Sequence, residues 1–183
     1  MVNSLLIGLI VLGVLVLWVI LIFNSLVRLR YKVKNAWSQI DVQLKRRYDL
    51  IPNLIETVKG YMKHEREVLT EITNARANLV SGSLKDRAKA SNQITDALKS
   101  VFAVAENYPK LQASENFKML QEELAGTENK ISYSRQYYND IVMNYNTKIH
   151  VFPSNMAAGI MGFKEEEFFK TEEKEKEPVK VKF

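Results

Sequence analysis

The chain has no cysteine, only two histidines, and few glycines and prolines among its 183 residues. The lack of cysteine excludes a thiol nucleophile, a disulfide and a thiolate metal site, and it suits a reducing compartment. Between residues 25 and 150 the helix-breaking residues are few: Gly60, Gly82, Gly126, Pro52 and Pro109. Since Lys, Glu, Ala and Leu are abundant and no stretch alternates as a half-buried strand does, we predict an all-α fold.

Catalytic motifs are missing too. The sequence contains no GxGxxG, GxxxxGK[ST] or GxSxG pattern. His64-Glu65 begins like the zinc motif HExxH, but the fifth position is Val68, so a solvated helix face explains the pair better. One group of carboxylates is similar to the ligands of di-iron bundles: Glu106, Glu122, Glu123 and Glu128. Their Glu-x-x-His partner motif is absent from the sequence. We therefore predict no catalytic, cofactor-binding or metal-binding residue, and a metal-dependent enzyme is the least favoured alternative.

What the chain does have is an apolar run from Leu5 to Phe23 without a charge, an Asn or a Pro. As a helix this run is about 28 Å long, which matches the ~30 Å hydrocarbon core of a bilayer. A cleaved signal peptide would begin with basic residues, have a shorter apolar run and end at a small-x-small site. Because none of these features is present, we expect residues 1–27 to form a retained transmembrane anchor.

Four cations follow this run, at Arg28, Arg30, Lys32 and Lys34, and no cation precedes it. The positive-inside rule then places the body of the protein in the cytoplasm and the N-terminus outside a bacterial cytoplasmic membrane. The same four side chains are predicted to contact lipid headgroups at the membrane surface. A second basic cluster, 45–47, follows them. The formal net charge of +5 is modest and its excess lies beside the anchor, so we predict no nucleic-acid partner.

Residues 28–151 are predicted to form a helical bundle. Apolar residues recur three and four positions apart from Leu26 to Leu44, and the pattern resumes after Pro52. Pro52 marks either a turn, with Asp49 as the cap of a new helix, or a kink in one long helix. We favour the turn, because a continuous helix over 28–80 would be about 80 Å long and poorly covered by the later helices. The turn gives an antiparallel, up-and-down four-helix bundle.

Helix ends are predicted at three further places: Ser81-Gly82-Ser83, Pro109 and Ser114. The last of these opens a helix over 114–150 with a coiled-coil-like stripe. The segment 152–169 is apolar, and the charged tail 170–183 is predicted to be disordered. Candidates for contact with the bilayer or a partner protein are Phe152, Met156, Ile160, Met161, Phe163, Phe168 and Phe169. The alternative is that these residues fold back and close one end of the bundle.

Five blocks of the sequence carry a resemblance to a known family. They are AWSQIDVQLKRRYDLIPNLIETVKGYMKHE (36–65), VFAVAENYPKL (101–111), LQEELAGTENKISYSRQYYNDIVMNYN (120–146), FPSN (152–155) and GFKEEEFF (162–169). Through these blocks the chain resembles the LemA family of bacterial membrane proteins. The resemblance implies a single transmembrane helix with its N-terminus outside, followed by an antiparallel helical bundle. It implies no enzymatic activity, and relatives among the proteins of magnetosome membranes imply a role in membrane organisation.

The expected function is a membrane-tethered scaffold or interaction module without catalysis. Its expected partners are the lipid bilayer and proteins that the sequence does not identify, and self-association stays open. The main alternative is a regulatory subunit of a membrane enzyme or transporter.

Overall fold

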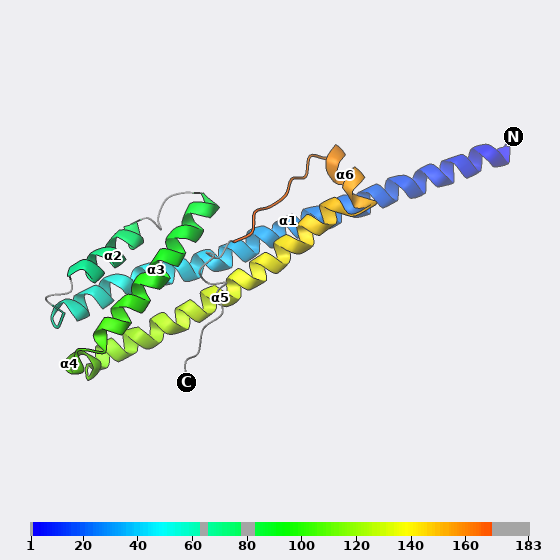
Figure 1. The fold of residues 1–183 in the computed structure, drawn as a ribbon. Coiled ribbons are helices and arrows are strands. Elements are labelled where there is room, and N and C mark those ends of the chain that lie inside the picture. Colours follow the sequence, from blue (N-terminus) through cyan, green and yellow to red (C-terminus); the bar gives the residue numbers. More distant parts are fainter. Residues whose placement is uncertain (1, 63–65, 78–82, 170–183) are drawn as a thin grey trace, which may run out of the picture. The chain divides into compact units, whose positions relative to one another are not determined.

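A computed structural model describes residues 2–62, 66–77 and 83–169. Over these residues the chain forms six helices and no strand, as Figure 1 shows. The helices are α1 (Val2–Lys59), α2 (Arg66–Ala77), α3 (Leu84–Ala105), α4 (Pro109–Gln112), α5 (Glu115–His150) and α6 (Ser154–Ile160). The predicted all-α fold is confirmed. Predictions for His64, for Ser81-Gly82 and for the tail 170–183 lie outside the described residues.

The chain divides into two compact units. Unit 1 consists of Met1–Ser38 with Gln136–Phe168, and unit 2 of Gln39–Arg135 with Phe169–Phe183. Helices α1 and α5 contribute to both units and run in opposite directions (Figure 1). Unit 1 also holds α6, whereas unit 2 holds α2, α3 and α4, with α2 packed against α3. The predicted domain boundaries after residues 27, 151 and 169 stay predictions.

The favoured turn at Pro52 is wrong, because α1 continues through this residue. The buried stripe of α1 in unit 2 crosses the proline without a break, at Ile40, Leu44, Arg47, Ile51, Leu54 and Val58. A proline inside a helix costs about 3 kcal/mol, whereas each fully buried aliphatic side chain contributes roughly 1.5–3 kcal/mol. Burial on both sides of Pro52 therefore outweighs the local cost. Four helices of comparable length are not confirmed.

The backbone group that Pro52 leaves without a helical donor finds another one. Proline has no N–H, so the carbonyl of Tyr48 loses its bond from position 52. Arg76 of α2 donates its Nε–H to this carbonyl at 3.2 Å. The guanidinium group of Arg76 also lies over the ring of Tyr48, 3.8 Å from the ring centroid. Arg76 thus completes α1 at the proline and fastens α2 to it.

This pairing predicts a coupling between Arg76 and Pro52. We expect Arg76→Ala to lower the free energy of unfolding of unit 2 by about 1–2 kcal/mol, through the lost hydrogen bond and ring contact. In a Pro52→Ala background the loss should be smaller by about 1 kcal/mol, because the new backbone N–H can then donate to Tyr48. Hydrogen exchange in mild detergent measures the free energy of unfolding of the full native chain, of each single variant and of the double variant. Equal costs in the two backgrounds would contradict the assignment.

A buried arginine forms the polar centre of unit 2. The side chain of Arg47 is fully buried, and it donates to the carbonyl of Ser91 at 3.1 Å, to the Oγ of Ser91 at 2.8 Å and to the Oγ1 of Thr95 at 3.0 Å. Arg47 also pairs with the carboxylate of Glu128 on α5, which accepts a further bond from Thr95 at 2.8 Å. Desolvation lowers the pKa of Arg47, and Glu128 opposes this shift. We call these four residues the Arg47 cluster; they join α1, α3 and α5.

Two carboxylates that were compared with di-iron ligands are engaged with arginines. Glu123 pairs with Arg46, and Glu128 pairs with Arg47. The predicted helix start at Ser83 is confirmed, because Ser83 and Asp86 form a reciprocal capping box at the start of α3. The hydrogen bonds to Ser83 hold the pKa of Asp86 below its usual range.

Candidate membrane interface

The first part of α1 presents apolar side chains to its surroundings on all sides. It is the one helix among the described residues that is long and apolar enough to cross a membrane. Apart from the less exposed Val19, the leucine, isoleucine and valine side chains from Leu5 to Leu21 are about half exposed or more. Burial begins further along α1 in unit 1, at Ile22, Leu26, Val33 and Ala36. Water is a poor environment for such a continuous apolar surface, whereas lipid is a suitable one.

Helix α6 in unit 1 has its large apolar residues on the outside. Ser154, Ala157 and Ala158 face the protein and are buried, whereas Met156 and Ile160 are 61% and 86% exposed. A surface helix of a water-soluble domain normally has the opposite arrangement, with its large apolar side chains inside. The outward face of α6 therefore fits an apolar environment outside the protein.

The end of α5 and the start of α6 are tied together. The hydroxyl of Ser154 donates to the carbonyl of Lys148 at 2.6 Å, which satisfies one of the last carbonyls of α5, and it lies 3.0 Å from the carbonyl of Val151. This tight connection leaves the side chain of Phe152 77% exposed. After α6, Gly162 adopts a positive φ of 72°, which a side chain would disfavour, and the chain turns back along α5.

Phe163 fixes where this segment lies in unit 1. Its ring packs edge-to-face on the ring of Phe23, with the centroids 6.1 Å apart. Phe23 is the last residue of the apolar run. Figure 1 shows α6 beside this part of α1. The exposed side chains of Phe152, Met156 and Ile160 thus belong to the same unit as the end of the predicted membrane span.

The chain after Gly162 is an extended segment that side chains of α5 bind through its backbone. Tyr145 donates its hydroxyl to the carbonyl of Lys164 at 2.9 Å, and Tyr138 donates to the carbonyl of Glu167 at 2.9 Å. Asn146 makes two bonds to Glu166, donating to its carbonyl at 2.9 Å and accepting from its N–H at 3.0 Å. We call residues 163–168 the strap. These contacts hold the strap in place.

The strap predicts a fall in stability at alkaline pH. Burial, assisted by the nearby carboxylates of Glu166 and Glu167, raises the pKa of Tyr138 to about 12, compared with about 10 in an unfolded chain. The folded state thus holds this proton more strongly. Its contribution is fully present below about pH 10 and is lost as the pH rises towards about 12. Tyr138→Phe should remove this alkaline loss of stability. Because the hydrogen bond to the strap is also lost, the variant should be about 1 kcal/mol less stable at neutral pH. Hydrogen exchange of α5 amides measures both, and an unchanged alkaline slope would contradict the prediction.

The four predicted surface cations lie on α1 in unit 1, and two of them have partners. Arg30 lies 3.8 Å from the carboxylate of Glu166 on the strap, and the ammonium group of Lys34 lies 5.6 Å from the ring centroid of Tyr31. Arg28 and Lys32 are exposed. The strap therefore brings one acidic side chain, Glu166, to one of the four cations, which the sequence pattern did not indicate.

The predicted apolar contacts do not behave as one group. Phe152, Met156 and Ile160 are strongly exposed, and Met161 and Phe168 are partly exposed. Phe163 is half-buried against Phe23. Phe169 is only 2% exposed, and the guanidinium group of Arg135 lies 4.5 Å from its ring centroid. We therefore remove Phe169 from the candidate interface. The second basic cluster, 45–47, also differs in exposure, because Lys45 and Arg46 are exposed whereas Arg47 is buried in the core.

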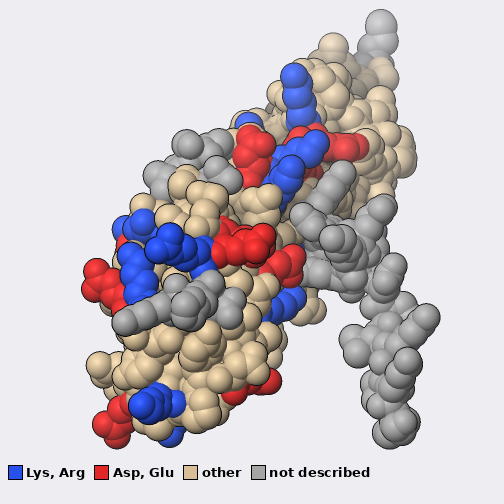
Figure 2. Space-filling view, turned by 60° about the vertical axis from the view of Figure 1, so that its left-hand side comes forward, with Lys and Arg blue, Asp and Glu red and all other residues tan. Residues whose placement is uncertain are grey.

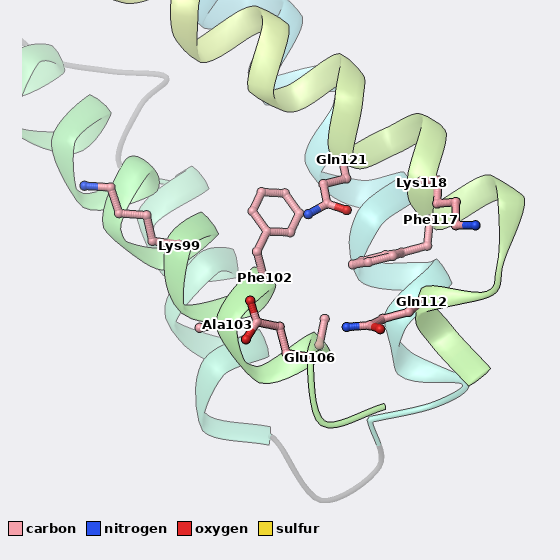
Figure 3. A pocket seen from close by; sticks show the side chains of 9 residues that line it. Lys99, Phe102, Ala103, Glu106, Gln112, Phe117, Lys118 and Gln121 are labelled. Atoms are coloured by element: carbon pink, nitrogen blue, oxygen red, sulfur yellow. The ribbon is translucent and has the colours of Figure 1, made fainter. Parts of the chain in front are cut away.

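A hollow in unit 2 has mixed chemistry. Its volume is about 570 Å³, and it lies among the end of α3, α4 and the start of α5. Figure 3 shows the rings of Phe102 and Phe117 in it, together with Glu106, Gln112 and Gln121. The two rings already pack edge-to-face, 6.3 Å apart. Lys99 and Lys118 lie at its edge, so the lining carries both signs of charge. On the face drawn in Figure 2, basic and acidic side chains also lie side by side. Neither surface indicates one class of charged ligand.

Comparison with known proteins supports the resemblance found in the sequence. The model of the LemA family matches residues 36–183. Protein LemA of Metamycoplasma hominis is 28% identical over 137 residues, which are 74% of this chain and 63% of that protein. Magnetosome protein MamQ 2 of Paramagnetospirillum magneticum is 24% identical, and MamQ of Magnetospirillum gryphiswaldense is 22% identical, each over 174 residues covering 80% of this chain and 64% of the relative.

The chain thus spans less than two thirds of the length of these curated relatives. None of their names denotes an enzyme. The family match covers most of the chain, including all of unit 2, and this protein belongs to the LemA family.

Proposed function

We propose that this chain is a non-catalytic, membrane-anchored helical protein that acts as a scaffold at the cytoplasmic face of a bacterial inner membrane. The apolar part of α1 spans the bilayer with its N-terminus outside. Arg28, Arg30, Lys32 and Lys34 follow on the cytoplasmic side and set the orientation. The segment from Phe152 to Ile160 enters the interface of the same leaflet.

The reversed arrangement of α6 is the observation that carries this proposal. Its small residues are inside and its large apolar residues are outside, and the following Phe163 packs on Phe23 at the end of the apolar run. A bilayer supplies the apolar environment that Met156 and Ile160 lack within the protein. The anchor and α6 then hold the chain at the membrane in two places.

Depth-dependent fluorescence quenching tests this contact. Phe152→Trp is placed in the full chain with Trp18→Phe and Trp37→Phe, and the protein is reconstituted with lipids brominated near the headgroup or near the chain ends. We expect strong quenching, strongest with bromines near the headgroup, because the side chain lies about 5–10 Å into the interface. Tyr133→Trp, an exposed position of α5 in unit 2, is the matched control and should not be quenched. Equal quenching at the two positions would contradict the proposal.

The scaffold role requires a protein partner, and unit 2 offers exposed apolar side chains for one. Met119 and Tyr133 lie two heptads apart on one side of α5 and are both more than 60% exposed. A photo-crosslinker at Tyr133 in cells is expected to capture protein, whereas one at the exposed Lys99 of α3 captures less. Capture of several proteins or of other copies of the chain supports a scaffold. Capture of a single enzyme in an amount equal to that of the chain would instead support the role of a regulatory subunit of that enzyme.

A further inference from the structure

We propose that α6 directs this chain to membranes with loosely packed lipids, such as the positively curved leaflet of a strongly bent membrane, and that lipid charge does not decide this preference. The proposal rests on the membrane contact of α6 proposed above and adds a selectivity to it. Three properties of unit 1 carry it: the lack of charge in the inserting segment, the large side chains that it exposes, and an acidic residue of the strap beside one of the neighbouring cations.

The inserting segment has no charged residue from Val151 to Phe163. A helix that binds anionic membranes by charge carries lysine or arginine on its polar face. The polar side chains of α6 are only Ser154 and Asn155, and the hydroxyl of Ser154 already lies against the carbonyls of Lys148 and Val151. Attraction between α6 and lipid phosphate groups is therefore weak, and the binding of α6 depends on its apolar side chains.

The exposed side chains are large and stand on a short element. Phe152, Met156 and Ile160 project from residues 152–160, and the helix itself packs closely on the protein through Ala157 and Ala158. Such an element can enter only the outer part of one leaflet. It needs space between the headgroups for three bulky side chains. That space is available where lipids are loosely packed and must be opened where they are tightly packed.

The neighbouring cations add little selectivity for lipid charge. Glu166 of the strap lies beside Arg30, Glu165 contacts His150 of α5, and Glu167 is a further acidic residue of the same unit. Lys34 lies over the ring of Tyr31. An anionic headgroup near Arg30 would therefore also meet the carboxylate of Glu166. Exposed charges are also screened within about 8 Å at physiological salt. Apolar insertion thus controls the preference.

Membrane tubes of controlled radius test the proposal. The chain has no cysteine, so Lys118→Cys provides one exposed labelling site in unit 2, and a membrane-impermeant maleimide dye then labels only copies whose bundle faces outwards. The full chain is reconstituted in giant vesicles of dioleoylphosphatidylcholine, with or without phosphatidylglycerol. Tubes are pulled outwards, and the ratio of dye in the tube to dye in the vesicle is measured. We expect at least about a twofold enrichment in narrow tubes, independent of phosphatidylglycerol and of salt.

The matched variants decide which residues cause the enrichment. Phe152→Ser combined with Ile160→Ser changes only strongly exposed side chains and should abolish the enrichment. Val42→Ser combined with Tyr61→Ser changes exposed side chains of unit 2 and should keep it. Enrichment that survives in the first pair, or that requires phosphatidylglycerol and disappears at high salt, would overturn the proposal. Quenching of Phe152→Trp without any enrichment would overturn the curvature preference alone, whereas absence of quenching would overturn the membrane contact itself.

Discussion

Arg47→Ala is expected to lower the free energy of unfolding of unit 2 by about 3–5 kcal/mol. The substitution removes a fully buried guanidinium group that makes bonds to Ser91 and Thr95 and pairs with Glu128. It leaves Glu128 beside the core without its counter-charge, and it leaves a cavity among α1, α3 and α5. The loss should appear as reduced hydrogen-exchange protection of α3 and of the first half of α5, in the full chain in mild detergent.

The neighbouring residue provides a matched control. Arg46 pairs with Glu123, but both side chains are about half exposed, so Arg46→Ala should cost less than about 1 kcal/mol. The two arginines are adjacent in the sequence and both pair with a glutamate of α5, so they differ mainly in burial. A similar cost for the two substitutions would show that the Arg47 cluster does not stabilise the core.

A second variant tests whether the ion pair itself, or only the loss of one partner, determines the stability of unit 2. Arg47→Met combined with Glu128→Leu replaces the buried ion pair by apolar side chains of similar size. Since desolvation of a buried pair offsets much of its attraction, this variant should be about as stable as the native chain, or more stable. We expect the free energies of unfolding of Arg47→Ala and of the double variant Arg47→Met with Glu128→Leu to differ by about 3 kcal/mol or more.

Moving the cations across the anchor is expected to invert the protein. The variant carries Arg28→Gln, Arg30→Gln, Lys32→Gln and Lys34→Gln, together with Asn3→Lys and Ser4→Lys. The basic residues then precede the apolar run, so the positive-inside rule predicts that most molecules place their bundle in the periplasm. The neutralised chain without the two new lysines should give a mixture of orientations. Labelling of a single introduced cysteine, Met143→Cys, with an impermeant maleimide in intact cells measures the inverted fraction.

This variant also tests whether the four cations are needed for the fold. Arg30 has only a long, exposed contact with Glu166, so its loss should change stability by less than about 1 kcal/mol. If the α5 amides stay fully protected while Met143→Cys becomes labelled in intact cells, the four cations set the orientation and are not needed for the fold. A native orientation in the variant would show that the charges do not set the topology.

The sequence predicted the elements that depend on local patterns. The spacing of apolar residues predicted the helices, Ser83 predicted the capping box, and the apolar run predicted the exposed first part of α1. These features can be read locally because helix periodicity and capping involve residues within a few positions of each other.

The missed features depend on residues far apart in the sequence. The helix passes Pro52 because Arg76, 28 positions from Tyr48, supplies the missing donor to the Tyr48 carbonyl. Arg47 belongs to the basic cluster 45–47 and looks like its neighbour Arg46, yet its partner Glu128 is 81 positions away. The strap could not be predicted at all, because α5 binds its backbone and backbone bonding leaves no pattern in the side chains.

The candidate interface was predicted in part for the same reason. Composition identified 152–169 as apolar, but it could not separate the exposed Phe152 and Ile160 from the buried Phe169. The ring of Phe169 contacts Arg135, which precedes it by more than thirty positions, so this contact is not visible in the local sequence. The reversed arrangement of α6 is visible only once its inner face is known.

Labelling of single cysteines in cells, in chains that keep all their native charges, tests most directly whether the chain spans the membrane with its bundle in the cytoplasm. Asn3→Cys and Met143→Cys are introduced one at a time into a chain that has no other cysteine. If the chain spans the inner membrane with its bundle in the cytoplasm, an impermeant maleimide labels Asn3→Cys in intact cells. It then labels Met143→Cys only after the membrane is opened. Labelling of Met143→Cys in intact cells, or release of the protein from membranes by alkaline carbonate, would contradict the account.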